Sequence, residues 1–279
     1  MRGTVALEEA EVRIRPVSVV PPVDSTTLTC GRAHVVLPAF NEEGSLPPLL
    51  RRLSNLSLAG GLTVWVVDDG SSDATAATAE RGVEGLDVRL VRHPVNLGLG
   101  RALLSGLRAA LAASGDDDVL IVMDADDTHD PGLIPLLQQE IAAGADVVIC
   151  SRFVDGGDDT TAPFGRRLLS RGAGALFRHT LDVDGVRDFT SGFRAYRATL
   201  LRRAAEHWGE RLVEEQGFAC MVELLLKLRH CDPVISEVPL PLRYDRKKSV
   251  SKLRLRRTMG QYAKLLMRDR LSPAPFRKL

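Results

Sequence analysis

Short apolar runs that alternate with longer amphipathic segments are the feature that most restricts the fold of this 279-residue chain. Runs rich in β-branched residues occupy residues 34–40, 62–69, 87–94, 118–126 and 145–153. Amphipathic segments of helical length follow the first, second, third and fourth runs, at residues 45–56, 73–82, 101–114 and 131–144. Buried strands followed by helices are typical of a mostly parallel sheet covered by helices. The alternation therefore predicts a Rossmann-like α/β fold.

The two ends of the chain differ from this central part. Residues 1–32 contain three prolines and a polar run, which favours an extension rather than a domain. Residues 243–279 carry 13 Lys or Arg against two acidic residues, which leaves the remainder with a net charge of about −10. We expect one α/β domain at residues 33–253 and a basic amphipathic helical tail at residues 254–279.

The regular alternation stops after Phe153. Residues 164–181 and 217–230 have helical patterns, and residues 233–245 resemble a strand whose prolines suit the edge of a sheet. Cysteine is sparse, and none of the four cysteines forms a CxxC pair, so we expect reduced thiols and no zinc. Charges interrupt the N-terminus, and no run approaches the roughly 20 apolar residues of a membrane helix. These features predict a cytoplasmic protein that contacts membranes only from the surface.

Aspartates stand directly after two of the predicted strands. Asp68 and Asp69 follow one strand, and Asp124 and Asp126 follow another. Because ligands bind at the carboxyl ends of such strands, these side chains should lie on one rim of the sheet. Two carboxylates at this spacing suit Mg²⁺ or Mn²⁺, which would in turn hold a diphosphate. The alternative is a solvated turn that caps the next helix, a role that Asp130 fits.

Two other functions can be read from the same rim segments. Residues 124–128, DADDT, also match the DxDxT nucleophile motif of haloacid-dehalogenase-like phosphatases. In that family the motif stands near the start of the core and a lysine follows, whereas here three strand–helix units precede it and residues 130–220 contain no lysine. Residues 96–100, NLGLG, lack the third glycine of GxGxxG, so we expect no nicotinamide cofactor.

Five rim segments occur in the order in which glycosyltransferase family 2 has them. They are LPAFNEE (37–43), VVDDGSSD (66–73), NLGLGRALLSG (96–106), DADDT (124–128) and DFTSGFRAYR (188–197). Over residues 34–253 the chain resembles this family, whose fold is called GT-A. Further segments make it most similar to polyprenyl- and dolichyl-phosphate hexosyltransferases: SRF (151–153), FGRRLLSRGAG (164–174), EEQGFACMVELLLKLRH (214–230) and EVPLPLRYDRKKSVSKL (237–253).

The resemblance implies a donor site for a nucleotide sugar. Pro38 and Phe40 would form an apolar ledge beneath the base, and Glu42 with Asp68 or Asp69 would accept hydrogen bonds from the base and ribose. The remaining donor residues that it implies are Asp124, Arg246 and Lys252. Asp124 and Asp126 would bind the metal, with Thr128, a weak neutral ligand, at the third position of the family's motif.

The resemblance also implies an acceptor that carries a phosphate. Such an acceptor is already ionised near neutral pH, so it requires cations rather than a general base. Arg152, together with a metal on Asp126, would stabilise the charge of the leaving group. Arg166, Ser170 and Arg194 would bind the acceptor, and the first two lie one helical turn apart.

The predicted function is an inverting transfer of a hexose from a nucleotide sugar to a polyprenyl phosphate at the cytosolic membrane face. The donor would be GDP-mannose or UDP-glucose. Glu214 and Glu215 keep an alternative open, in which a carboxylate serves as the base for a hydroxyl acceptor on a small molecule or glycan. A non-catalytic nucleotide-sugar-binding module and the phosphatase are more remote alternatives.

The basic tail has an apolar helical stripe. Leu255, Met259, Tyr262 and Leu266 recur at helical spacing, and basic residues flank them. Such a helix can lie in a lipid interface and be attracted by an anionic membrane surface. Nucleic acid is not an expected partner, because the stripe has few aromatic side chains and the rest of the chain is acidic. Packing of the stripe against the domain is the alternative.

Overall fold

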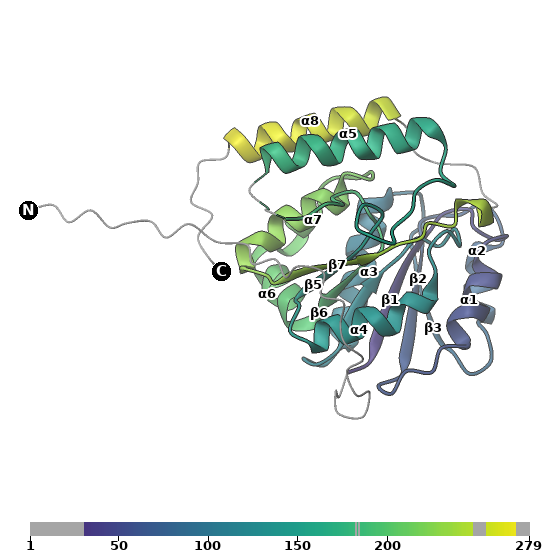
Figure 1. Cartoon of the computed structure of the whole chain (residues 1–279). Coiled ribbons are helices and arrows are strands. Elements are labelled where there is room, and N and C mark those ends of the chain that lie inside the picture. Colours follow the sequence, from purple (N-terminus) through teal and green to yellow (C-terminus); the bar gives the residue numbers. More distant parts are fainter. Residues whose placement is uncertain (1–30, 182, 184, 248–254, 272–279) are drawn as a thin grey trace, which may run out of the picture.

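A seven-stranded sheet forms the centre of the molecule in the computed structural model (Figure 1). The structure describes residues 31–247, apart from 182 and 184, and residues 255–271. The strands are β1 (Ala33–Ala39), β2 (Leu62–Asp68), β3 (Asp87–Arg92), β4 (Val119–Val122), β5 (Val147–Ser151), β6 (Arg194–Arg197) and β7 (Ile235–Pro239). The α-helices are α1 (Leu46–Ser54), α2 (Thr75–Arg81), α3 (Leu99–Ala113), α4 (Ile134–Ala142), α5 (Phe164–Thr180), α6 (Ala198–Trp208), α7 (Cys220–Leu228) and α8 (Leu255–Leu271).

The strand order is β3-β2-β1-β4-β6-β5-β7. β1 pairs in parallel with β2 and β4, β2 with β3, and β5 with β7. β6 is the exception, because it lies antiparallel between β4 and β5. The sheet is thus mostly parallel and flanked by helices, as the alternation predicts, and the antiparallel β6 is an element that the sequence analysis did not identify.

Side chains alternate between two cores on the two faces of the sheet. In β1, Val36 joins the core formed with α3, α5, α6, α7 and α8, whereas Val35 and Leu37 join the core formed with α1 and α4. This alternation follows from the two-residue period of a strand whose faces are both covered. The central strands are buried on both sides, so their carboxyl ends are held rigidly at the rim.

The first helix shows how local sequence produces these elements. Prolines occupy the first turn of α1, where a missing backbone N–H costs no hydrogen bond. Leu46, Leu49, Leu50 and Leu53 are its buried residues, and their i, i+3, i+4 and i+7 spacing places them on one face of the helix. The helix therefore packs against the sheet through leucines alone and exposes its polar side.

The last helix packs onto the body of the protein beside α5, and the two lie side by side over α7 (Figure 1). Tyr262 and Leu265 of α8 belong to the core, and the Tyr262 ring meets Phe177 of α5 edge-on with centroids 5.0 Å apart. The prediction that this stripe faces lipid is wrong at Tyr262, which faces the protein. Met259 is 55% exposed, so the members of that stripe do not share one environment. The side chain of Leu255 lies outside the described residues.

Within the part of the chain that the structure describes, none of the helices combines the length and the apolar character needed to cross a bilayer. Cys150, Cys220 and Cys231 are free and buried.

Candidate active site

A cavity opens at the carboxyl edge of the sheet. From β1 the strand order runs one way through β2 and β3 and the other way through β4, so the topology reverses between β1 and β4. Open α/β sheets bind ligands at such a reversal. The cavity has a volume of about 660 Å³, and its walls come from the end of β1, the segment after β4, the start of α3, the segment before α7, and α8. Three of the aspartates predicted to lie on the rim line this cavity: Asp69, Asp124 and Asp126.

Asp126 has charged and neutral partners at once. Its Oδ1 accepts hydrogen bonds from the backbone N–H of Thr128 at 3.2 Å and from the Thr128 hydroxyl at 2.7 Å. Its Oδ2 pairs with the ammonium group of Lys247. Burial raises the pKa of Asp126, but the charge of Lys247 and these hydrogen bonds outweigh burial, so the pKa lies below its usual value. Thr128, predicted as the third metal-side residue, uses its hydroxyl to orient Asp126.

Asp124 is positioned by a histidine that the sequence analysis did not select. The backbone N–H of Asp124 donates to Nδ1 of His129 at 3.1 Å, and Nε2 of His129 lies 3.9 Å from Oδ2 of Asp124. The His129 ring is buried and stacks on Phe193 with centroids 5.2 Å apart. Because Nδ1 accepts a hydrogen bond, the neutral ring carries its proton on Nε2, toward the carboxylate. The sequence feature that could have identified His129 is its position within one turn of the aspartate pair.

Asp124 and Asp126 fit a divalent cation. Both carboxylates line the same cavity, and Asp126 already has a positive charge against one oxygen. Mg²⁺ is usually held by one or two carboxylates, while waters and substrate phosphates complete its shell. In residues 31–247 and 255–271, as far as they are described, no group of three His, Cys, Asp or Glu side chains is arranged for a metal. The protein would therefore supply two carboxylates, and the substrate would supply further oxygens.

Asp69 organises the loop at the start of α3. Its Oδ1 accepts hydrogen bonds from Nδ1 of His93 at 2.7 Å and from the N–H of Leu97 at 2.9 Å. Its Oδ2 accepts from the N–H of Gly98 at 2.8 Å. Gly98 has a φ of +93°, a conformation that strongly favours glycine, and α3 begins directly after it. Asp69 therefore shapes the cavity wall through this loop.

Asp68 has a different place from its neighbour. It is fully buried, its Oδ1 accepts from the N–H of Ser71 at 3.1 Å, and its Oδ2 lies 3.6 Å from Nε of Arg92. Asp68 is not among the residues that line the cavity. Of the two aspartates proposed as alternatives for the donor, Asp69 is the one that reaches the cavity.

The other predicted base-binding residues line the same cavity. Pro38 belongs to β1, and Phe40 and Glu42 follow this strand. Glu42 is buried, and its backbone N–H donates to the hydroxyl of Thr75 at 2.7 Å, which fixes the loop after β1 against α2. The wall therefore offers an apolar surface and a carboxylate, as a nucleoside requires.

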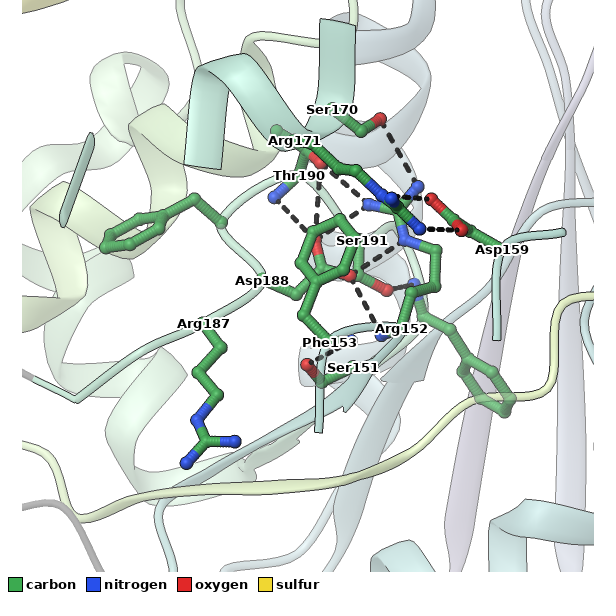
Figure 2. A network of polar contacts seen from close by, with 12 residues as sticks. Ser151, Arg152, Phe153, Asp159, Ser170, Arg171, Arg187, Asp188, Thr190 and Ser191 are labelled. Atoms are coloured by element: carbon green, nitrogen blue, oxygen red, sulfur yellow. Dashed lines mark hydrogen bonds and ion pairs between the residues drawn. The ribbon is translucent and has the colours of Figure 1, made fainter. Parts of the chain in front are cut away.

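Arg152 lies in a buried ion-pair network (Figure 2). Its Nε and Nη2 donate to both carboxylate oxygens of Asp188 at 2.8 and 2.7 Å, and Nη2 also donates to the Thr190 hydroxyl at 2.7 Å. Its Nη1 lies 3.4 Å from Oγ of Ser170. Burial lowers the pKa of Arg152 and raises that of Asp188, but their mutual attraction reverses both shifts. Arg152 is therefore a permanent cation fixed by a bidentate partner.

A small hollow connects this network with the metal-binding candidates. It is lined by Asp124, His129, Arg152 and Thr190 together with residues of the neighbouring elements. The hollow thus brings a rim carboxylate and the predicted catalytic arginine to the same space. Ser170, one of the predicted acceptor residues, contacts Arg152 from α5.

Arg194, another predicted acceptor residue, is fully enclosed in the core. Its Nη1 donates to the carbonyl of Met221 at 2.8 Å and its Nη2 to the carbonyl of Phe189 at 2.6 Å. These contacts join β6 to α7 and to the segment before β6. They give Arg194 a structural role, and its contact with an acceptor stays a prediction.

The remaining predicted phosphate-binding residues are only partly described. Arg166 lies in α5 one turn before Ser170, but its side chain is outside the described residues, as is the whole of Lys252. Arg246 ends a 3₁₀ turn at Tyr244–Arg246, and its buried Nη1 has no hydrogen-bond partner among the residues described. A buried donor without a partner is destabilising, so this nitrogen is suited to an anionic ligand.

A second group missed by the sequence analysis is Glu223, a carboxylate that is 1% exposed. Its Oε2 accepts hydrogen bonds from the N–H groups of Glu214 at 2.8 Å and Glu215 at 2.7 Å. Its Oε1 meets Nζ of Lys227 at 2.9 Å and Nη2 of Arg268 at 2.6 Å. One buried carboxylate therefore joins α7, the segment before it and α8.

The segment held by Glu223 forms a wall of the cavity. The carbonyl of Gln216 accepts a hydrogen bond from the N–H of Gly100 at 3.2 Å. A Cβ at Gly100 would lie 1.8 Å from the carbonyl oxygen of Glu215, so only glycine permits this approach of α3. Gln216, Arg257 and Gln261 line the cavity, so α8 completes its wall.

The two glutamates considered as a base for a hydroxyl acceptor are engaged by cations. Oε2 of Glu214 lies 2.9 Å from Nζ of Lys227, and Oε1 of Glu215 lies 3.4 Å from Nζ of Lys264. Burial raises the pKa of Glu214, but Lys227 and the neighbouring arginines hold it below its usual value. A carboxylate with a lowered pKa is a weaker general base, and neither glutamate is among the lining residues.

Comparison with known proteins points to one family. A sequence profile described as Glycosyl transferase family 2 matches residues 34–204. Polyprenol monophosphomannose synthase of Mycolicibacterium smegmatis is 33% identical over 248 residues, which span 87% of this chain and 90% of the relative. Undecaprenyl-phosphate mannosyltransferase of Micrococcus luteus is 34% identical over 75% of this chain and 82% of its own length. Dolichol-phosphate mannosyltransferase of Pyrococcus furiosus is 34% identical over 75% of this chain but only 55% of its own length.

Solved structures show the same architecture. Glucosyl-3-phosphoglycerate synthase from Mycobacterium tuberculosis, in complex with Mn²⁺, UDP and glucosyl-3-phosphoglycerate, aligns with a TM-score of 0.61 at 23% identity, over 95% of this chain and 89% of that chain. The complex with phosphoglyceric acid gives a TM-score of 0.59 at 23% identity, over 88% and 81%. At this identity the likeness concerns the fold. Together with the profile match and the relatives at 33% and 34% identity, it shows that the chain belongs to glycosyl transferase family 2 and is a glycosyltransferase with the GT-A fold.

Proposed function

We propose that the protein transfers a hexose from a nucleotide sugar to a polyprenyl phosphate, with inversion at the sugar. The observation that carries this proposal is the small hollow lined by both Asp124 and Arg152. It contains Asp124, a carboxylate suited to a metal that would hold a diphosphate, and Arg152, which is fixed beside Ser170. The relatives named as mannosyltransferases of polyprenol, dolichol or undecaprenyl phosphate support the same acceptor class.

The donor would occupy the larger cavity. Pro38 and Phe40 would contact the base, and Glu42 and Asp69 would accept hydrogen bonds from the base or ribose. Arg246 would use its buried Nη1 for a donor phosphate, and Lys252 would reach the phosphates from the segment that follows. GDP-mannose is the first candidate donor because the relatives are named as mannose-transferring enzymes, and UDP-glucose is the second.

Mg²⁺ or Mn²⁺ would be held by Asp124 and Asp126. Bound there, the cation would neutralise the charge that develops on the leaving diphosphate. His129 keeps Asp124 oriented from behind, and Thr128 keeps the Asp126 carboxylate in position. Lys247 pairs with one oxygen of Asp126 and keeps the side chain ionised, and a bound cation would share or replace this contact.

The acceptor phosphate would lie near Arg152, Arg166 and Ser170. A phosphate acceptor attacks without losing a proton, so the site needs cations and no general base. This requirement agrees with Glu214 and Glu215, which are paired with lysines and arginines. Arg152 donates to Asp188 through two nitrogens, which leaves Nη1 directed toward Ser170 for the acceptor.

We infer that the protein meets its lipid substrate at the cytosolic face of a membrane as a peripheral protein. Phe164 and Leu168 of α5 are 75% and 63% exposed, and Met267 of α8 is 60% exposed. α5 and α8 lie side by side, so these apolar side chains belong to one layer of the molecule. Large apolar side chains on a surface that also carries arginines favour contact with an anionic membrane.

Transfer assays with alternative acceptors test the proposal. The protein is incubated with Mn²⁺ and either GDP-mannose or UDP-glucose, together with undecaprenyl phosphate, phosphoglyceric acid or no acceptor. The proposal predicts a lipid-linked hexose with one of the donors and release of the nucleotide only when the lipid phosphate is present. Transfer to phosphoglyceric acid in preference to the lipid would favour the hydroxyl-acceptor function. Nucleotide-sugar binding without transfer to either acceptor would contradict both.

A further inference from the structure

A hollow of about 610 Å³ lies beside the Arg152 network and is separate from the cavity at the rim. Its lining consists of the four arginines Arg152, Arg171, Arg178 and Arg187, with Phe153 and Val154 between them. The arginines come from three parts of the chain: the turn after β5, helix α5 and the segment before β6. Four guanidinium groups around one hollow give it a positive potential, which attracts anions.

Three described carboxylates beside the hollow, those of Asp188, Asp159 and Glu237, are already engaged. Asp188 is used by Arg152 in a bidentate pair. Asp159 is shared, because Arg171 lies 2.8 Å from its Oδ1 and Arg167 lies 3.6 Å from the same oxygen. The buried Glu237 directs its carboxylate at the backbone N–H groups of Arg187 and Asp188, at 3.1 and 2.9 Å, rather than at a guanidinium.

Arg178 and Arg187 remain without a carboxylate partner among the described residues. Nη1 of Arg178 donates to the backbone carbonyl of Arg187 at 3.3 Å, which fixes the Arg178 side chain over this segment. The Arg187 side chain extends away from the Arg152 network (Figure 2). Both arginines are exposed, so their guanidinium groups are accessible to a ligand.

We propose that this hollow, through Arg178 and Arg187 with Arg171 at its edge, is a second anion-binding site that takes a phosphate group. Planar guanidinium groups bind phosphate oxygens in a bidentate manner, and several arginines around one hollow match a phosphate better than a carboxylate. Arg152 lines this hollow and also belongs to the proposed acceptor site, but the second phosphate would be bound by Arg178, Arg187 and Arg171 rather than by Arg166 and Ser170, and its binding does not depend on the proposed transfer reaction.

The neighbouring surface favours the phosphate of a lipid headgroup over free phosphate. Phe164, Arg171 and Arg178 lie at i, i+7 and i+14 in α5 and therefore share one face of the helix. Leu168, one turn after Phe164, is also exposed. A ligand with a phosphate head and an apolar chain could thus contact the arginines and this face together. Such a lipid would hold α5 at the bilayer while the acceptor site stays open.

The test compares binding of full-length protein to a phosphate on a lipid and to free phosphate. Vesicle sedimentation uses phosphatidylcholine with phosphatidylglycerol, and matched vesicles in which oleate supplies the same charge. A second arm measures how far inorganic phosphate raises Tm. The variant is R178Q/R187Q, and the control is R51Q/R81Q, which removes the same charge from exposed arginines of α1 and α2. R178K/R187K keeps the charge but lacks the planar groups.

We expect R178Q/R187Q to bind phosphatidylglycerol vesicles about 100-fold more weakly, since each arginine would contribute a charge-assisted hydrogen bond to the phosphate worth about tenfold. R51Q/R81Q should bind like the wild type, and R178K/R187K should recover only part of the loss. A lipid source predicts that only the phosphatidylglycerol arm separates the variants, whereas a free-phosphate source predicts a smaller Tm rise in R178Q/R187Q. Equal binding by R178Q/R187Q and wild type in both arms, or an equal loss with oleate vesicles, would overturn the phosphate site.

Discussion

At the scale of single residues, the two rim aspartates are held by different means. Asp124 is oriented through its backbone N–H by His129, and Asp126 is oriented through its side chain by Thr128 and Lys247. In both cases the carboxylate keeps access to the cavity. The positive charge of Lys247 also keeps Asp126 ionised despite burial. Asp126 is therefore prepared as an anion, which is the state a divalent cation requires.

Substitution of one rim aspartate should show this directly. Asp126→Asn keeps the size of the side chain but removes its charge, so we expect turnover to fall by about 10²-fold, the effect of losing one electrostatic stabiliser of a leaving group. Asp127→Asn is the matched control, because Asp127 pairs with Arg52 and does not line the cavity. Steady-state assays in Mn²⁺ measure the effect. Full activity of EDTA-treated protein would show that no metal takes part.

A second prediction at this scale concerns His230 and pH. Burial, with the charge of Arg229 nearby, lowers the pKa of His230 to about 4. An unfolded histidine titrates near 6.5, so between these values the unfolded state binds more protons and stability falls as pH falls. With allowance for solvent screening, the free energy of unfolding should drop by about 1 to 2 kcal/mol between pH 7.5 and pH 5 from this group.

Urea unfolding at both pH values measures this drop. His230→Gln should show a smaller drop than the wild type, because the substituted side chain does not titrate. His179→Gln is the control, since His179 is exposed on α5 and is not among the groups that lower the pKa of His230. The same drop in the wild type and in His230→Gln would contradict the assignment.

At the scale of elements, α8 is the part whose role changes most between sequence and structure. Its basic composition and apolar stripe suggested a helix that lies in lipid, yet Tyr262 and Leu265 are in the core. Arg268 of α8 pairs with the buried Glu223, and Arg229 pairs with Asp269 at 2.6 Å. Since α8 also lines the donor cavity, a chain ending at Leu253 should lose nucleotide binding as well as membrane binding.

Glu223→Gln tests the connection between α8 and the cavity. It leaves the buried Lys227 with less compensating charge, and breaking a buried ion pair typically destabilises by about 3 kcal/mol. We therefore expect a lower free energy of unfolding and weaker nucleotide binding. Glu210→Gln removes an exposed glutamate that pairs with Arg101 and Arg108, and it should leave both quantities unchanged. Nucleotide binding at the wild-type level in Glu223→Gln would separate this network from the cavity.

The helix α5 carries the prediction that separates acceptor from donor. Arg166→Ala should raise the KM for polyprenyl phosphate about tenfold, the effect of one charge-assisted hydrogen bond, and leave nucleotide binding unchanged. Arg167→Ala is the control. It removes the neighbouring arginine of α5, which lies 3.6 Å from Asp159 and is not assigned to the acceptor. Titration of the nucleotide and steady-state assays of the lipid give the two readouts. An equal loss of both affinities would place α5 on the donor side.

At the scale of the whole molecule, the sequence allowed prediction of the sheet and the rim but not of contacts between distant segments. The alternation of apolar runs and helical segments identified β1 to β5 with α1 to α4, because buried strands and amphipathic helices have distinct periods. β6 was missed because four residues, RAYR, with an arginine at each end do not resemble a buried strand. Arg194 is nevertheless fully enclosed, since backbone carbonyls accept its hydrogen bonds.

For the candidate site too, the sequence allowed prediction of the strand-end residues but not of the contacts between distant segments. Strand-end position identified Asp69, Asp124 and Asp126, which all line one cavity. The contacts of Lys247 with Asp126 and of Arg268 with Glu223 join residues 121 and 45 positions apart, and no local pattern signals them. Likewise, the spacing of the α8 stripe could not show which of its members faces α5. Tertiary packing decides that question.

The most direct test of the central claim compares two lipids that differ only in the attacking group. The protein is given GDP-mannose or UDP-glucose with Mn²⁺ and either a polyprenyl phosphate or the polyprenol of the same length, and mass spectrometry measures the products. The proposed mechanism predicts that a hexosyl polyprenyl phosphate forms with the ionised phosphate, and that the polyprenol is left unchanged because its hydroxyl needs a base and Glu214 and Glu215 are engaged by cations. Glycosylation of the polyprenol at a comparable rate would contradict that mechanism.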